Sequence, residues 1–397
     1  MKSKILIVTQ NYPPENFGNA SRINDLAINL MTLGSNVTVI SPHPTFPYGG
    51  FKKSWKLCSS RNINNINHLT IFTWQPTASN PSFLSRMSYY LTFPIHAIIW
   101  ALMKRKEYDV IITTSPPIFT GITGFFIKKI ARKKWFFDVR DLWIDASVSL
   151  DFIKKNSFFE KISRKFEQMC YFVCDGITVT TEQIKNIIGE TSDVPVDKIK
   201  VISNGVDTKI FTPLKIKKNR IIYSGLLGHA QELEKVFLAI KKLHEKFPIE
   251  FYVVGDGDTK KNLEAAVKKE GLEGIVIFTG RLPRDQIPGL IAESLIGVAP
   301  LKDLVSLRYA IPTKIYEYMA CGIPFIATGG GEIERLARDS GAGVVAESSV
   351  ESIYEHMVYL LDNEPLRDTM GVKGREFVEN CCNREKITEE LIRFIEK

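Results

Sequence analysis

The stretch Lys4-Ile5-Leu6-Ile7-Val8-Thr9 indicates the fold, because it is a short apolar run of a kind that recurs along the chain. Amphipathic stretches separate each run from the next. Continuous apolar runs that alternate with helices are typical of parallel strands buried on both faces of a sheet. We therefore predict a first series of strands at residues 4–9, 36–41, 68–74, 108–115, 134–139 and 176–181.

The same rhythm restarts after about residue 205. Between the two series lie Asn204-Gly205-Val206-Asp207 and a basic stretch at 215–219, and such turn residues followed by a polar run are typical of a linker. The fold class that we predict is α/β, with two Rossmann-like doubly wound domains facing a central cleft. The second series of strands is predicted at 220–225, 250–255, 274–280, 296–301, 324–328 and 343–346.

The predicted domains are residues 1–203 and 204–380. A final helix at 381–397, with its apolar residues at helical spacing, is expected to pack back on the first domain.

The composition, with 44% hydrophobic and 24% charged residues, is ordinary for a globular protein. The longest candidate for a membrane span, 84–103, is interrupted by Arg86, Pro94 and His96. The apolar run at the N-terminus is too short for a signal peptide, so we expect a cytoplasmic protein. The six cysteines show no paired CxxC spacing, which favours reduced thiols over structural zinc. The formal net charge of +8 favours a polyanionic surface or an anionic substrate.

Two glycine-containing turns follow predicted strands. The loop 10–22 leads through Gly18 into a helix, and the start of a helix is a ready anion site, although a plain connecting loop fits the same residues. No GxGxxG fingerprint is present there, which counts against a dehydrogenase. The second turn is Gly255-Asp256-Gly257-Asp258. We expect its glycines to allow close approach of a ligand, and we regard metal binding by the DxD pattern as the lesser alternative.

The segment 311–327 predicts a short helix that Pro312 and Thr313 open, that Gly322 ends, and that a buried strand follows. Lys314 and Glu317 share one face of that helix. A surface ion pair is one interpretation. However, Lys314 stands in the first turn, where the helix dipole disfavours a cation unless an anion is bound, so we favour a role in ligand binding.

These motifs resemble those of the retaining glycosyltransferases of family 4, which have the GT-B fold. The resemblance covers nearly the whole chain and is carried by Asn204–Asp207, Gly255–Gly257 and Tyr316–Pro324. A narrower similarity, to the WbuB-like branch that transfers N-acetyl-fucosamine and similar amino sugars, is carried by Tyr12–Pro14, Ser115–Pro117, Asp138–Trp143 and Pro312–Lys314.

The resemblance implies that Glu317 matches the second glutamate of the family's E-x7-E motif and holds the nucleotide ribose. The first glutamate is replaced by Tyr309, and the family's histidine before aspartate is replaced by Arg140-Asp141. Its paired Arg and Lys are replaced by the stretch 224–231. A leaving diphosphate must be stabilised by fixed cations. Lys314, His229 and Arg140 are the candidates, with a neutral loop residue as the alternative for His229 and an ion-pair partner as the alternative for Arg140.

The predicted site combines three groups of residues and needs no cofactor and no metal. The catalytic candidates are Lys314, His229, Arg140 and Asp141; the donor-binding candidates are Gly18, Gly225, Gly255, Gly257, Arg281, Pro312, Thr313, Lys314, Tyr316 and Glu317; the acceptor-binding candidates are Asn19, Arg22, His43 and Asp145.

The resemblance implies retaining transfer of a sugar from a UDP-linked donor to a glycan or lipid-linked acceptor in surface polysaccharide biosynthesis, such as O-antigen or capsule. By the similarity to the WbuB-like branch, the expected sugar is an N-acetylated deoxy-amino sugar. The first domain would bind the acceptor and the second the nucleotide sugar. Basic and aromatic residues at 125–135, with the aromatic stretch 89–93, favour peripheral contact with the inner face of an anionic cell membrane over a plain crossover helix. Nucleic acid is not an expected partner. A nucleotide-sugar epimerase of the same fold and a non-catalytic sugar-nucleotide-binding scaffold stay open as alternatives.

Overall fold

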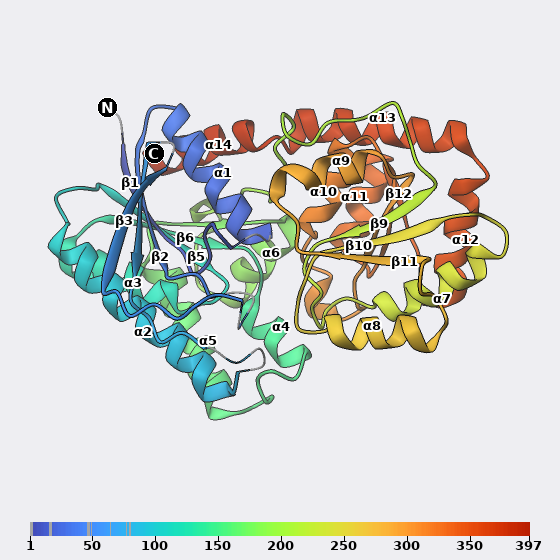
Figure 1. Cartoon of the computed structure of the whole chain (residues 1–397). Helices are drawn as coiled ribbons and strands as arrows, with labels where there is room; N and C mark the ends of the chain where they lie inside the picture. The colour runs from blue at the N-terminus through green and yellow to red at the C-terminus, as the bar shows by residue number, and fades with distance from the viewer. Residues whose placement is uncertain are drawn as a thin grey trace. The chain divides into compact units, whose positions relative to one another are not determined.

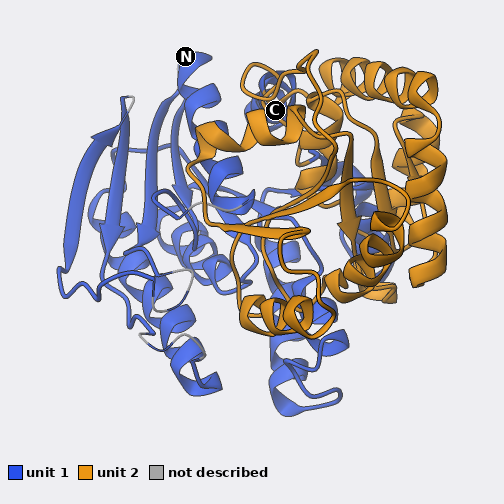
Figure 2. Ribbon diagram, turned by 45° about the vertical axis from the view of Figure 1, so that its right-hand side comes forward, with its two compact units in different colours: residues 1–203, 385–397 blue, residues 204–384 orange. Residues whose placement is uncertain are grey.

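The computed structural model of the chain describes residues 3–15, 18–45, 48, 50–63, 65–76, 78 and 81–397. The chain forms two compact units, which Figure 2 colours separately. Unit 1 comprises residues 1–203 and 385–397, and unit 2 comprises residues 204–384. The chain therefore leaves unit 1 once, completes unit 2, and returns.

Unit 1 is built on an eight-stranded sheet in the described part of the chain, with the order β3-β4-β2-β1-β5-β6-β7-β8. Its strands pair in parallel, apart from β3, which runs antiparallel to β4. The strands are β1 Lys4–Val8, β2 Asn36–Pro42, β3 Cys58–Ile63, β4 Ile66–Ile71, β5 Val110–Ser115, β6 Lys134–Val139, β7 Gly176–Val179 and β8 Ile199–Val201.

Helices cover both faces of this sheet (Figure 1). On one face, α1 and α14 share a core with β1, β2 and β5, and Phe136 of β6 contacts Phe394 of α14 with ring centroids 5.6 Å apart. On the other face, Gly121 and Gly124 of α3 lie against Phe137 and Trp135. The helices are α1 Gly18–Thr32, α2 Phe83–Met103, α3 Thr120–Phe126, the π-helix η1 Ile127–Ala131, α4 Trp143–Ser149, α5 Phe158–Val173, α6 Glu182–Thr191, η2 Val196–Lys198 and α14 Arg384–Glu396.

Unit 2 is built on a six-stranded parallel sheet with the order β11-β10-β9-β12-β13-β14. Two apolar cores pack on its two faces, one beneath α9, α10, α11 and α13 and the other beneath α7, α8 and α12 (Figure 1). The strands are β9 Arg220–Ser224, β10 Glu250–Val254, β11 Val276–Gly280, β12 Ile296–Pro300, β13 Phe325–Thr328 and β14 Gly343–Val345. The helices are α7 Leu233–His244, α8 Lys260–Lys269, η3 Arg284–Gln286, α9 Ile287–Ala292, η4 Val305–Leu307, α10 Thr313–Ala320, α11 Glu332–Ser340, α12 Val350–Leu361 and α13 Glu364–Cys381.

Each predicted strand is present, and the α/β fold with two Rossmann-like sheets is confirmed. The prediction missed β3, which is polar and largely exposed and therefore carries no apolar run, and β8, which has only three residues. Unit 2 also ends at Arg384 instead of residue 380. The physical reason is that Val206 N donates to Cys382 O at 2.9 Å and Arg384 N donates to Val206 O at 3.1 Å, which ties these residues to unit 2.

No helix among the described residues combines the length and the apolar character that a crossing of the bilayer requires.

Candidate functional site

The sheet of unit 2 opens between its two central strands. Strand β9 pairs with β10 along its whole length, but it pairs with β12 only at Ile221 and Ile222. The strand order reverses at this point, since β10 lies on one side of β9 and β12 on the other. Ligands of doubly wound sheets bind outside the carboxyl ends of the strands at such a switch point.

Tyr318 of α10 fills the opening. Its hydroxyl accepts a hydrogen bond from Ser224 N at 3.0 Å and donates one to Val298 O at 3.1 Å, so it bridges the end of β9 and the middle of β12. Gly297 makes room for the ring, because a Cβ atom there would lie 2.4 Å from it. This anchor holds the first turn of α10, just after Pro312, against the carboxyl end of β9.

Lys314 is the charged group that this turn brings to the switch point. The residue is only 9% exposed. Its Nζ donates to Gln231 Oε1 at 3.2 Å and lies 3.7 Å from the centroid of the Tyr223 ring. Gln231 is held in turn by a β-bridge to Leu301, at the end of β12. The lysine is thus surrounded by an amide oxygen and an aromatic face.

The charge of Lys314 is poorly compensated. Burial lowers the pKa of its ammonium group to about 7, although Glu317 acts in the opposite direction. Within the part of the chain that the structure describes, Lys314 Nζ forms no ion pair. A buried cation in the first turn of a helix is unfavourable on both counts. A bound anion would supply the missing compensation.

Glycines clear the space around this lysine. Gly225 has φ of +142°, and a Cβ atom there would lie 3.0 Å from Lys314 Cε. At Gly255 and Gly257, Cβ atoms would lie 1.9 Å from Gly225 O and 2.3 Å from Leu227 O. These two glycines therefore let the turn after β10 pack on the turn after β9. At Gly255 and Gly257, the close neighbour is protein backbone. From the sequence, we expected these glycines to allow the close approach of a ligand.

The remaining candidates of unit 2 surround the same strand ends. Glu317 is half-buried one turn after Lys314, whereas the side chain of Tyr316 lies in the apolar core. Pro312 caps α10, Thr313 begins it, His229 is exposed in the turn after β9, and Arg281 directly follows β11. Asp256 Oδ1 accepts from Gly257 N at 2.9 Å. Among the described residues there is no cluster of three or more His, Cys, Asp and Glu side chains with the geometry of a metal site.

The strand ends of unit 1 hold a compensated cluster of charges. Asp138 of β6 binds two buried arginines: Arg22 Nη2 donates to Asp138 Oδ2 at 2.7 Å, and Arg140 Nη1 donates to Oδ1 at 2.8 Å. Thr178 Oγ1 also donates to Oδ1 at 2.7 Å. Burial raises the pKa of Asp138, but the two arginines and Thr178 outweigh it and lower that pKa to about 2. Arg140 thus makes the ion pair that the sequence left open as its alternative role.

The other candidates of unit 1 each contact protein groups. Asn19 Oδ1 accepts from Arg22 Nη2 at 3.4 Å, and His43 Nε2 is 2.9 Å from Lys56 O. Asp145 Oδ1 accepts from Arg164 Nη2 at 2.9 Å. Burial raises the pKa of Asp141 to about 6, against the lowering effects of Arg140 and Arg22.

The predicted anion site before α1 is described in part. Gly18 is exposed and is the first residue of α1, so the helix begins within the stretch 10–22 that was predicted to be a loop. Asn16 and Phe17 of the preceding loop lie outside the described residues.

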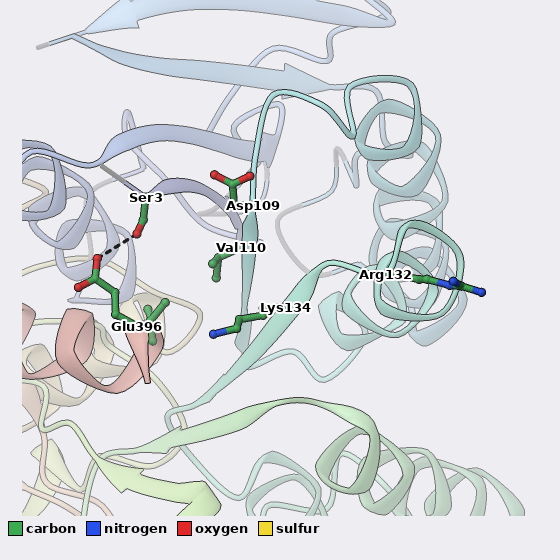
Figure 3. Close-up of a pocket in the computed structure, with 7 residues that line it drawn as sticks. Ser3, Asp109, Val110, Arg132, Lys134 and Glu396 are labelled. Carbon is green, nitrogen blue, oxygen red and sulfur yellow. Dashed lines mark hydrogen bonds between the residues drawn. The ribbon is translucent and has the colours of Figure 1, made fainter. Parts of the chain in front are cut away.

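A pocket of about 490 Å³ lies at the opposite, amino ends of the strands in unit 1 (Figure 3). Asp109, Val110 and Lys134 line it beside Ser3, whose hydroxyl donates to Glu396 Oε1 at 3.0 Å. In Figure 3 the Arg132 side chain points away from this group. Since doubly wound sheets bind ligands at the carboxyl ends of their strands, we do not assign the substrate to this pocket.

The segments predicted to face a membrane are partly buried. Trp135 and Ile127 are fully buried, as are Tyr89 and Phe93 of α2. Lys128 pairs with Asp175 at 2.5 Å. The sequence-based assignment of Trp135, Tyr89 and Phe93 to a membrane face is therefore wrong. These side chains lie on the inner faces of their elements, which a basic or aromatic composition alone does not reveal.

The sequence did not reveal the roles of three residues. Tyr318 and Gln231 position Lys314 in unit 2, and Asp138 compensates the arginines of unit 1. In the sequence, Tyr318 stands out only as a member of the motif Tyr316–Pro324. Its position four residues after Lys314 on one helix was the available signal.

Two family models match the chain. The model of glycosyl transferases group 1 matches residues 207–377, and the model of Glycosyltransferase Family 4 matches residues 18–210. A curated relative is WcaI of Escherichia coli (strain K12), named as a glycosyl transferase of colanic acid biosynthesis. It is 22% identical over 98% of this chain and 98% of its own length.

Solved structures share the fold. Sucrose-phosphate synthase from Thermosynechococcus elongatus superposes with a TM-score of 0.79 at 16% identity, covering 99% of this chain and 98% of that one. HepE of Anabaena in complex with UDP-glucose has a TM-score of 0.73 at 16% identity, covering 99% of both chains.

Proposed function

Because this chain is a glycosyltransferase with the GT-B fold, we propose that it transfers a sugar from a UDP-linked donor to a glycan or lipid-linked acceptor, with retention of anomeric configuration. The observation that supports the donor assignment best is the buried, poorly compensated charge of Lys314 at the switch point of unit 2. Breaking the bond to a diphosphate develops negative charge that a fixed cation stabilises. HepE, a structural neighbour, is solved with UDP-glucose.

Lys314 is therefore the proposed catalytic cation. The nucleoside diphosphate would bind outside the ends of β9 and β10, with its phosphates at the first turn of α10. No metal is expected to be required, since the lysine and the backbone N–H groups of that turn can serve the diphosphate. Transfer activity should then persist in EDTA, and loss of activity that Mg²⁺ or Mn²⁺ restores would contradict this part of the proposal.

Glu317 is the proposed ribose ligand, because a half-buried carboxylate one turn after Lys314 can accept hydrogen bonds from two adjacent hydroxyls. Glu317→Ala should weaken UDP binding by about 1.5 to 3 kcal/mol, measured by titration calorimetry. Glu351→Ala removes an exposed glutamate from another helix of the same unit and is the matched control. Equal UDP affinity in the folded Glu317→Ala variant and the control would remove the ribose assignment.

For the acceptor, we propose that unit 1 binds a glycan carried on a lipid diphosphate at the cytoplasmic face of the membrane, in a pathway of surface polysaccharide biosynthesis such as O-antigen or capsule. The similarity to WcaI supports the pathway class. An N-acetylated deoxy-amino sugar, as in the WbuB-like branch, is the proposed donor sugar.

A donor screen followed by a transfer assay tests the proposal. A nucleotide sugar at one hundred times its Kd should stabilise the protein by about 2.7 kcal/mol, which thermal shift detects. UDP should then be released only when a lipid-linked acceptor is added, and the new bond should keep the donor's anomeric configuration by NMR. Conversion of the donor without acceptor would favour an epimerase, and binding without either reaction would favour a scaffold.

A further inference from the structure

Helix α2 has an unusual surface, because it is apolar on both sides. Its inner face packs Tyr89, Phe93, Ala97 and Ala101 into unit 1. Its outer face carries a row of exposed apolar residues, which we name the α2 ridge: Leu84, Leu91, Ile95, Ile99 and Met103. Their spacing of four or seven residues keeps them on one side of the helix. A surface helix normally presents polar residues to water, so this outer face is expected to have an apolar partner.

The charges around the ridge are positive. Arg86 is the sole charged residue from 83 to 103, and the chain continues with Lys104, Arg105 and Lys106. The first acidic residue beyond them, Glu107, pairs with Lys104 at 2.7 Å. Helix α2 also contacts η1, which adds the exposed residues Lys129 and Ile130, and α3, which ends at the exposed Phe126. Apolar side chains bounded by cations are complementary to an anionic, amphiphilic partner.

Two exposed tryptophans lie at the side of α2. Trp74 N donates to Thr92 Oγ1 at 3.0 Å, which fixes the segment after β4 to the helix. Trp74 and Trp55 contact each other edge to face, with ring centroids 6.5 Å apart, and they are 45% and 66% exposed. Lys53 Nζ lies 4.0 Å from the ring centroid of Trp55 and 4.1 Å from that of Trp74. Tryptophan is enriched where a protein meets lipid headgroups, and a lysine beside it can contact the lipid phosphates.

We propose that the α2 ridge, with Trp55, Trp74 and the cations Arg105, Lys106 and Lys129, is the surface by which unit 1 docks in the headgroup region of an anionic lipid bilayer. The ridge would enter the boundary between headgroups and acyl chains, with α2 parallel to the membrane plane. The cations would contact lipid phosphates. This deepens the proposed membrane contact, and it depends on the proposed function only for its purpose, since lipid binding requires no sugar transfer.

Vesicle co-sedimentation tests the proposal with phosphatidylglycerol and phosphatidylcholine at 3:7, compared with pure phosphatidylcholine. Wild-type protein should bind the anionic vesicles more tightly, and less so at high salt. Arg105→Gln with Lys106→Gln should weaken binding roughly thirtyfold, since each cation near such a surface contributes about fivefold. Ile95→Ser with Ile99→Ser should weaken it by about tenfold or more, because the buried apolar area is lost.

Matched controls carry the same changes elsewhere. Lys268→Gln with Lys269→Gln removes two exposed cations from α8, and Val305→Ser with Val372→Ser removes two exposed apolar residues from unit 2. Both controls should bind vesicles like wild type. All variants should keep the wild-type UDP affinity, which shows that they are folded.

Tryptophan fluorescence locates the surface directly. Brominated lipids should quench wild-type emission, and Trp55→Phe with Trp74→Phe should remove most of that quenching. Two results would overturn the proposal: wild-type vesicle binding by both ridge variants, or a dimer in solution that Ile95→Ser with Ile99→Ser converts to a monomer. The second result would identify another copy of this chain as the partner of the ridge.

Discussion

The two units differ in how the buried cations at the carboxyl ends of their strands are paired. In unit 1, Arg22 and Arg140 both bond to Asp138 at 2.7 and 2.8 Å. In unit 2, Lys314 contacts only an amide oxygen and an aromatic ring among its described hydrogen-bond and ring partners. The first arrangement pairs each cation with a carboxylate, whereas the second leaves a charge that an anion can compensate. The contrast is the basis of our proposal that the unit 2 lysine serves the substrate, and it predicts a structural role for the unit 1 arginines.

The strongest test of this contrast removes the carboxylate of unit 1. Asp138→Asn would leave two buried arginines without their partner and should lower the free energy of unfolding by about 3 to 5 kcal/mol, measured by urea denaturation at pH 7. The pKa of Asp138 is lowered to about 2, so its stabilising contribution is present above about pH 4 and is lost as the pH falls toward 2.

Glu351→Gln is the control for this variant, because it breaks an exposed ion pair with Lys242 and should leave stability nearly unchanged. A similar, small effect of both substitutions would mean that the cluster of unit 1 is not structural.

The second test removes the cation of unit 2. Lys314→Met should lower kcat/KM about 100- to 1000-fold, the usual effect of losing one group that stabilises a developing anion. Its thermal stability should not fall at pH 6, because a lysine with a lowered pKa destabilises the folded state while it is charged. Lys314→Arg should not restore full activity, since the guanidinium fork needs more room than the ammonium group. Near wild-type turnover of Lys314→Met would reject the catalytic assignment.

The third and smallest effect is a coupling of protons to ligand binding. The pKa of Lys314 is lowered to about 7 by burial, and a bound diphosphate would raise it toward its ordinary value. UDP binding should therefore take up protons above pH 7, and the affinity should fall by at most about tenfold per pH unit as the pH rises. Calorimetry at pH 8 in Tris and in phosphate should give different binding enthalpies. The difference should disappear in Lys314→Met, and its absence in wild type would contradict the coupling.

The sequence predicts the strands more completely than it predicts the contacts within the site. Buried strands such as β5 and β12 are continuous apolar runs, so composition alone reveals them. The position of Lys314 in the first turn of α10 likewise follows from Pro312 and the apolar period. Its partner Gln231 lies 83 residues away in the chain. Such a contact depends on strand order, which no local pattern contains.

The same limit applies to the ion pair of Arg140 and to the segment 125–135. Arg140 sits two residues after Asp138, but their ion pair also involves Arg22, 116 residues from Asp138. For 125–135, composition suggested a continuous membrane segment, whereas a π-helix and a strand send its residues to different sides. The α2 ridge lies within the run 84–103, which its polar interruptions exclude as a membrane span. The sequence does not show that this run is exposed on one side only, because that depends on the burial of Tyr89 and Phe93.

The return of the chain to unit 1 has a consequence for biosynthesis. Residues 204 and 384 are neighbours within unit 2, because Arg384 Nε donates to Asn204 O at 3.3 Å. Unit 2 is therefore a closed insertion whose two ends meet. Unit 1, in contrast, needs Leu391 and Ile395 of α14 to complete the core beneath α1. Residues 385–397 follow unit 2 in the chain, so unit 1 can complete this core only after unit 2 has been translated.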